Sequence, residues 1–150
     1  MTHVEKAIDL FSKKFHCSQA VFAAFAPELG LTEEQALKIG ACFGSGMRKG
    51  EVCGACTGAL MALGLKYGQA DEQDLESRLK TNEVTDRFLE EFQKENGSYL
   101  CNDLLGCDIR TEAGVAEALE KKLFTGFCPK MVESATKIVE EIILVNQISS

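Results

Sequence analysis

The 150-residue sequence contains no apolar run that approaches the roughly 20 residues a helix needs to cross a bilayer. Its first ten residues place the acids Glu5 and Asp9 among apolar positions and lack the apolar core of a secretory signal. We therefore expect a cytoplasmic protein with no membrane partner. In a reducing compartment of that kind, structural disulfides are rare.

The sequence also has few cations for a nucleic-acid-binding protein. Lys and Arg total 16 against 23 Asp and Glu, so the formal net charge is −7 and the pI is about 4.9. Proteins that hold the phosphate backbone do so with clustered Lys and Arg, and anionic membranes attract the same kind of cluster. We therefore expect neither nucleic acid nor a membrane surface as a partner.

Signals for β-strands are missing as well. No run alternates apolar and polar residues, and no Asn-Gly or Asp-Gly turn joins two such runs. Apolar residues recur at helical spacing instead. We predict an all-α fold, a single bundle-like domain over residues 1–150 with about six or seven helices. The expected helices cover residues 2–14, 17–26, 32–42, 54–67, 71–96 and 128–145, with a short one from 111, about one turn within 98–108 and a connector at 124–127.

Two of these helices carry more detailed predictions. Thr32 and Gln35 have the spacing of a capping box, which places a helix start at Thr32. The long helix over 71–96 has an apolar stripe that is weakest at 81–83, which allows a kink there. The stripe that we expect to be buried consists of Leu75, Leu79, Phe88, Leu89 and Phe92.

A glycine-containing loop runs from Phe43 into Cys53. Its glycines give the backbone access to positive φ, so the loop can turn tightly or approach another group closely. Arg48 and Lys49 in the same loop either lower the pKa of Cys53, bind an anion, or form a plain exposed pair. The glycines of the loop are Gly44, Gly46 and Gly50.

The helix that follows this loop contains a strip of small residues. Gly54, Gly58 and Ala62 recur at every fourth residue and so share one face. Because each glycine costs a helix about 1 kcal/mol relative to alanine, the strip indicates unusually close packing. The partner is either another helix of the same chain or the same strip across a dimer interface.

Seven cysteines occur in a sequence with only two histidines. Their odd number argues against a fully paired disulfide framework and leaves metal ligands, catalytic thiols and buried apolar residues. Cys53 stands where the loop meets a helix, and a helix N-terminus favours the thiolate that reacts and binds metals. Cys17 and Cys128 also stand at predicted helix starts. Cys42 falls on an apolar stripe inside a helix, and we interpret it as a packing residue.

Cys53 and Cys56 form a Cys-x-x-Cys, but the usual contexts of that motif are missing. No strand precedes it as in thioredoxin-like proteins, and Thr57 stands where a c-type haem motif has histidine. No second Cys-x-x-Cys completes a zinc ribbon. Four thiolates drawn together from distant positions would suit an iron–sulfur cluster or a structural zinc. The set that we single out is Cys53, Cys101, Cys107 and Cys128.

The histidines are weaker candidates for a functional site. We interpret His3, near the start of the chain, as solvated. His16 lies next to Cys17 and offers a ligand or a base, but a partly exposed histidine at a helix end is the interpretation we favour.

Several segments taken together carry a resemblance. They are Cys17-Ser-Gln-Ala-Val, the stretch 43–65, Cys101-Asn-Asp-Leu-Leu-Gly-Cys-Asp, Leu123-Phe and Cys128-Pro. The chain resembles the C_GCAxxG_C_C family of proposed redox-active proteins over nearly its whole length. The Cys-Gly-Ala-x-x-Gly core is met by Cys53, Gly54, Ala55 and Gly58.

The resemblance implies redox chemistry without naming a substrate. By motif, the family's recurring cysteines are similar to Cys17, Cys53, Cys101 and Cys128, and Cys107 is a common companion. Cys42 and Cys56 look like additions of this chain. A more distant similarity to the helical iron–sulfur domain of split-Soret cytochromes also implies a cluster, although their haem-attachment motif is lacking here.

Three hypotheses follow. In the first, Cys53, Cys101, Cys107 and Cys128 bind an iron–sulfur cluster that exchanges electrons with a partner oxidoreductase, and Cys17 is a spare ligand or a near neighbour. Backbone N–H groups of the glycine loop would then donate to the cluster sulfurs. The glycines expected there are Gly44, Gly46, Gly50 and Gly54.

In the second hypothesis no cluster is bound, and Cys53 is a nucleophilic thiolate. Cys56, Cys101 or Cys128 then resolves its disulfide, and Cys17 is a further redox thiol. In the third, the chain is a structural or partner-binding helical protein, either stabilised by zinc or free of metal. A homodimer interface through its strip of small residues is one form of this hypothesis.

Overall fold

The computed structural model describes residues 1–149. No β-strand occurs in this range, and the β pairing within it is an isolated antiparallel bridge between Val52 and Leu100. The predicted all-α fold is therefore confirmed. The α-helices are α1 (His3–Ser12), α2 (Cys17–Phe25), α3 (Glu33–Ile39), α4 (Gly54–Tyr67), α5 (Leu75–Asn96), α6 (Cys101–Leu105), α7 (Glu112–Glu120), α8 (Leu123–Gly126) and α9 (Cys128–Ser149), with 3₁₀ turns at Ala26–Leu29 and Gly40–Cys42.

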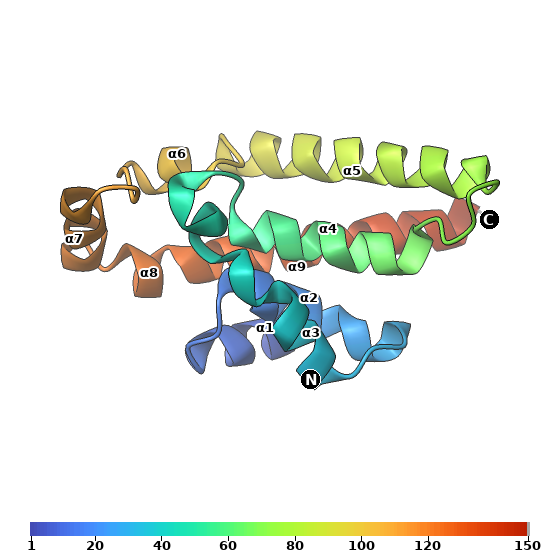
Figure 1. The fold of residues 1–150 in the computed structure, drawn as a ribbon, viewed down its shortest axis with the longest axis horizontal. Coiled ribbons are helices and arrows are strands. Elements are labelled where there is room, and N and C mark those ends of the chain that lie inside the picture. The colour runs from blue at the N-terminus through green and yellow to red at the C-terminus, as the bar shows by residue number, and fades with distance from the viewer. Residues whose placement is uncertain (150) are drawn as a thin grey trace.

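Three long helices, α4, α5 and α9, run side by side along the molecule (Figure 1). The N-terminal helices lie on one side of them, with α2 against α4 and α1 against α9. The short helices α6, α7 and α8 gather at one end of the molecule (Figure 1). Helices α4 and α9 begin at this end, and α5, which runs in the opposite direction, ends there (Figure 1).

Helix α4 packs closely on α2 because small residues remove side-chain bulk between them. A Cβ added to Gly58 would lie 2.5 Å from the carbonyl oxygen of Ser18, and one added to Gly54 would lie 3.3 Å from the backbone nitrogen of Ser18. Ala62, the next residue of the strip, is fully buried. The strip therefore packs within one chain, and the alternative of a dimer interface through it is wrong.

Helix α5 buries a shorter face than its sequence suggests. Leu75 and Leu79 are 60% and 69% exposed, so their predicted burial is wrong. The helix begins at Leu75 because the Asp74 side chain caps it, accepting a 3.0 Å hydrogen bond from the Ser77 N–H. It then runs unbroken through 81–83, without the kink that we allowed for. The buried residues of α5 are Val84, Phe88 and Phe92.

Other helix ends follow local signals. The capping box at Thr32 is confirmed, with hydrogen bonds of 3.1 and 3.0 Å exchanged between Thr32 and Gln35. Residues 123–126, predicted as a connector, form the short helix α8, and α9 continues past the predicted end at Val145. Among residues 1–149, no helix combines the length and apolar character that crossing a membrane requires.

Candidate functional site

Four cysteines from four different helices line one cavity of about 170 Å³. Cys17, Cys101 and Cys128 are the first residues of α2, α6 and α9. Cys53 is the N-cap of α4. We refer to these four residues as the cavity cysteines. Unpaired N–H groups at the starts of helices favour nearby negative charge, which acts against the burial that disfavours thiolates in the cavity.

The rest of the cavity wall is mostly apolar. Aromatic and aliphatic side chains surround the sulfurs. Polar interactions are stronger in such apolar surroundings than in water. Cys17 and Cys128 are nonetheless partly exposed, so the cavity is not sealed from solvent. The other lining residues are Phe11, Phe15, His16, Ser45, Gly54, Leu104, Leu105, Phe124, Phe127 and Met131.

Backbone pairing brings two of the cavity cysteines together across a long stretch of sequence. The Cys53 N–H donates to the Tyr99 carbonyl oxygen at 2.7 Å, and the Cys101 N–H donates to the Glu51 carbonyl oxygen at 2.6 Å. These two bonds flank the isolated bridge between residues 52 and 100. The chain just before α4 is thereby held against the chain just before α6.

The loop that leads into α4 makes one left-handed turn. Ser45, Met47 and Arg48 have φ values of 53°, 57° and 63°, and Gly46 among them has a φ of 60°. A residue with a side chain is strained in this region, by roughly 1–2 kcal/mol, so the contacts around the loop must hold the turn in place. Positive φ, expected from the loop glycines, is confirmed for Gly46 and for Gly50, whose φ is 69°.

Two loop glycines are needed because other groups approach the backbone closely. A Cβ on Gly44 would overlap the imidazole ring of His16, at the start of α2. A Cβ on Gly50 would overlap the side-chain amide of Asn102, on α6. The loop therefore lies between two helices whose first residues are cavity cysteines.

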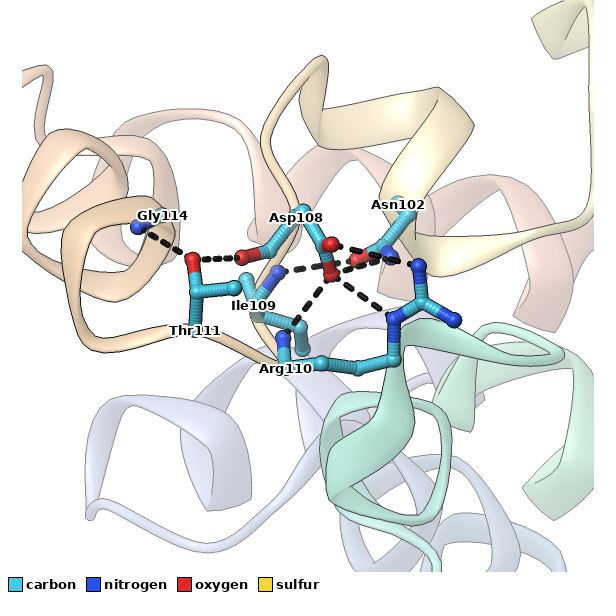
Figure 2. Close-up of polar contacts among 6 residues, drawn as sticks. All are labelled: Asn102, Asp108, Ile109, Arg110, Thr111 and Gly114. Carbon is cyan, nitrogen blue, oxygen red and sulfur yellow. Dashed lines mark hydrogen bonds and ion pairs between the residues drawn. The ribbon is translucent and has the colours of Figure 1, made fainter.

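Asn102 and Asp108 hold the segment after α6 in place (Figure 2). The Asn102 Nδ2 donates to Asp108 Oδ1 at 3.0 Å, and its Oδ1 accepts from the Ile109 N–H at 3.1 Å. Arg110 donates to both carboxylate oxygens of Asp108, which lowers the pKa of Asp108 to about 2. This network fixes Cys101, the residue before Asn102, relative to the turn that follows α6.

Asn102 and Asp108 were not among the residues predicted from the sequence. Asn and Asp side chains often bond to backbone groups in turns, and Asn102 and Asp108 bracket the turn at Gly106. Their position on either side of this turn was the signal from which they could have been predicted.

Thiol pairs set the electrostatics of the site. A hydrogen bond between the Cys17 and Cys128 thiols raises the pKa of Cys17 and lowers that of Cys128. A hydrogen bond between the Cys53 and Cys56 thiols lowers the pKa of Cys53. Burial raises the pKa of Cys56. Burial, followed by the charges of Cys53 and Cys128, raises the pKa of Cys101 to about 12. Among the cavity cysteines, Cys53 and Cys128 are thus the two whose pKa is lowered.

Cys107 lies outside the cavity. It is buried in a small apolar cluster, apart from the main core, together with Ile109 and Ala118. Its Sγ donates to the Leu105 carbonyl oxygen at 3.6 Å. The chain turns between Cys101 and Cys107 at Gly106, whose φ is 69°. The set expected from the sequence and the set at the cavity therefore differ in one member, because Cys17 lines the cavity and Cys107 does not.

Cys42 is exposed, so its predicted packing role is wrong. The predicted helix ends before it, and the 3₁₀ turn at Gly40–Cys42 breaks the helical periodicity that placed it in the core. His16 is exposed as expected, although it lines the cavity. His3 is not simply solvated, because its ring stacks on Phe25 at 4.3 Å and bonds to Glu28 and Glu140.

No ready-made metal site is present among residues 1–149. No three side chains of His, Cys, Asp or Glu are grouped there as the ligands of one ion. The thiol hydrogen bonds are pairwise: Cys17 bonds to Cys128 within the cavity, and Cys53 bonds to Cys56, which lies outside it.

Comparison with known families places this arrangement in context. A model of the C_GCAxxG_C_C family, described as "Putative redox-active protein", matches residues 15–142. The chain belongs to this family. The matched range contains all seven cysteines, so the four cavity cysteines of this C_GCAxxG_C_C protein lie within it. No curated protein and no solved structure matches the chain.

Proposed function

We propose that this protein binds an iron–sulfur cluster through its four cavity cysteines and exchanges electrons with a partner oxidoreductase. The observation that carries the proposal is the position of Cys17, Cys53, Cys101 and Cys128 around one cavity. Iron–sulfur clusters are usually held by four cysteine thiolates, so the number and type of ligands fit. Membership of a family described as redox-active supports the same class of chemistry.

The charge balance of the cavity also favours a bound cation. The pKa of Cys101 is raised to about 12 because it is buried and because Cys53 and Cys128 add like charge. Four thiolates in an apolar space repel one another unless positive charge is supplied. No Lys or Arg lines the cavity. Iron provides the missing positive charge, and the thiols release their protons as it binds.

The residues around the cavity have defined roles in this proposal. The bound cluster supplies a reversible electron acceptor. Phe11, Phe15 and Phe127 limit the access of water to it. Gly54, the first residue of α4, lines the cavity, and its backbone N–H would donate to a sulfur of the bound cluster. Such hydrogen bonds raise the reduction potential of a cluster.

The other glycines of the predicted donor set have a different role. Gly44, Gly46 and Gly50 do not line the cavity. They allow the loop to turn and to approach α2 and α6, and so they position Cys53.

The test is to purify the protein without oxygen, reconstitute it with iron and sulfide, and measure its visible absorption together with its iron, sulfide and zinc content. A brown protein with matching iron and sulfide supports the proposal. A colourless protein that holds zinc in the same cysteines would instead establish a structural metal. Protein that takes up neither metal after reconstitution would contradict the proposal.

Ligand variants sharpen this experiment. Cys17→Ser is expected to lose or alter the cluster, whereas Cys107→Ser is expected to keep its absorption spectrum. Cys42→Ser, which changes an exposed thiol, is the matched control. The reverse result, with Cys107 essential and Cys17 dispensable, would favour the ligand set expected from the sequence.

A second candidate function is dithiol–disulfide exchange by Cys17 and Cys128. Their thiols interact directly, and both residues line the cavity. In this chemistry the two thiols lose two protons and two electrons to a partner disulfide, which leaves as two thiols. Oxidised protein would then yield the tryptic peptides 15–38 and 123–130 joined by a disulfide. Joined peptides from a colourless protein would favour this function over the cluster.

A further inference from the structure

Cys56 is a buried thiol that the proposed cluster does not use. It is completely inaccessible to solvent, and it does not line the cavity. It lies on the first turn of α4, and its backbone N–H donates to the Cys53 carbonyl oxygen at 2.9 Å. Its thiol is in contact with that of Cys53. The Cys53 sulfur thus faces both the cavity and the buried Cys56 thiol.

We propose that Cys53 and Cys56 form a reversible disulfide, a modification site that withdraws the Cys53 sulfur from the cavity. The existence of the disulfide is independent of the proposed function. Its consequence, a protein that does not bind the cluster while oxidised, rests on that proposed function.

The position of the two residues favours this bond. Two Cα atoms three residues apart along a helix are separated by about 5 Å, which lies within the range of roughly 4.4–6.8 Å seen in disulfides. An N-cap side chain normally turns back towards the third residue of its helix, and Cys56 is that residue of α4. The bond therefore forms without moving one helix against another.

The other cavity cysteines are less suited to pair with Cys53. Cys17 and Cys128 already interact with each other. Cys101 begins a different helix, and the backbone bridge before it pairs Cys101 with Glu51 and Cys53 with Tyr99, so the two cysteines are not opposite each other. Only Cys56 shares a helical turn with Cys53.

A small hydroperoxide is an oxidant that fits the site. The Cys53 thiolate attacks one oxygen of hydrogen peroxide, so a sulfenic acid forms and hydroxide leaves. The Cys56 sulfur then attacks the Cys53 sulfur, the S–S bond forms, and the sulfenic oxygen leaves as water with the thiol proton. The peroxide is reduced, and the two thiols are oxidised by two electrons. A dithiol reductant reverses the change.

Tryptic digestion isolates this pair. Cleavage after Lys49 and Lys66 releases the peptide 50–66, which contains Cys53 and Cys56 and no other cysteine. Reduced, metal-free full-length protein is exposed to equimolar hydrogen peroxide, and its free thiols are then alkylated. We expect peptide 50–66 to become two hydrogens lighter and to resist alkylation, and dithiothreitol to restore both thiols.

Two variants serve as comparison and control. In Cys56→Ser the internal disulfide cannot form, and Cys53 is expected to appear as a sulfenic acid or as a free thiol. In Cys42→Ser the disulfide forms as in the unmodified chain. Peptide 50–66 with two alkylated cysteines after peroxide, or Cys53 joined to another peptide, would overturn the proposal.

Iron uptake separates this inference from the proposed function. We expect oxidised protein to take up no cluster until dithiothreitol is added, and Cys56→Ser to take up the cluster normally when reduced. If the disulfide forms but reduced protein never binds iron, the proposed function fails and the modification site stands. If reduced protein binds iron but peptide 50–66 never forms the disulfide, only the modification site fails.

Discussion

The backbone N–H of Cys53 donates a 2.7 Å hydrogen bond to the carbonyl oxygen of Tyr99. This bond joins the start of α4 to the segment that follows α5, far along the sequence. Together with the bond from the Cys101 N–H to Glu51, it sets the positions of two cavity cysteines. The cavity thus depends on contacts outside its own wall, and these contacts can be tested without changing a cysteine.

Asn102 is the first such contact. We expect Asn102→Ala to lower the free energy of unfolding by about 1–3 kcal/mol, because the N–H of the buried residue Ile109 loses its partner. The measurement is urea unfolding, with iron retention as a second readout. The exposed neighbour Asp103 provides the control Asp103→Asn, expected to change stability by less than about 0.5 kcal/mol. Equal unfolding midpoints for the two variants would contradict the role given to Asn102.

Helix α4 supplies a matched pair of glycines, Gly58 in the small-residue strip and Gly64 outside it. A Cβ at Gly58 would lie 2.5 Å from the Ser18 carbonyl oxygen, whereas nothing lies within 4 Å of one at Gly64. Gly58→Ala should therefore destabilise the protein by about 1–3 kcal/mol through overpacking. Gly64→Ala should stabilise it by about 0.5–1 kcal/mol through helix propensity. Thermal unfolding of both variants decides the matter, and changes of the same sign would argue against the close packing of α2 on α4.

The buried face of α5 can be checked in the same way. Phe88 is fully buried and Leu79 is 69% exposed. We expect Phe88→Ala to cost about 3–5 kcal/mol and Leu79→Ala to stay within about 0.5 kcal/mol of the unmodified chain. Denaturant unfolding measures both. A large loss from Leu79→Ala would restore the sequence-based prediction that this residue is buried.

His3 predicts a pH dependence of stability. Burial lowers its pKa, but hydrogen bonds to Glu28 and Glu140 outweigh burial, and the pKa of His3 is raised above its usual value of 6.5. Its stabilising contribution is therefore complete below about pH 6.5, where the unfolded chain also binds the proton, and it is lost as the pH rises through the higher folded value.

The measurement for His3 is the thermal midpoint between pH 5 and 9 for the unmodified chain and for His3→Gln, which keeps a hydrogen-bonding side chain. The difference between the two midpoints should shrink as the pH rises. Lys66 lines the same surface hollow and is present in both proteins, so the comparison isolates His3. A difference that grows with pH would show that the folded pKa is lowered instead.

Local signals in the sequence predicted much of the fold. The capping box at Thr32 and the apolar spacing of α1 and α9 placed helices where the structure has them. These signals succeed because N-caps and helical periodicity act over a few neighbouring residues. Predictions failed where a short turn interrupted a pattern, as at Cys42, or where a pattern ran beyond the packed part of a helix, as at Leu75.

Local sequence likewise predicted part of the candidate site, and tertiary packing decided the rest. Helix-start position, a property of local sequence, singled out Cys17, Cys53 and Cys128 for chemistry. Whether Cys17 or Cys107 joins Cys101 at the cavity depends on the left-handed turn at Gly106 and on the packing of α2 against α4, which no local pattern contains. Composition and spacing therefore determined an all-α, cysteine-bearing protein. Long-range packing chose the cysteines that share a cavity, because contacts between residues far apart in the chain exist only once the helices have assembled.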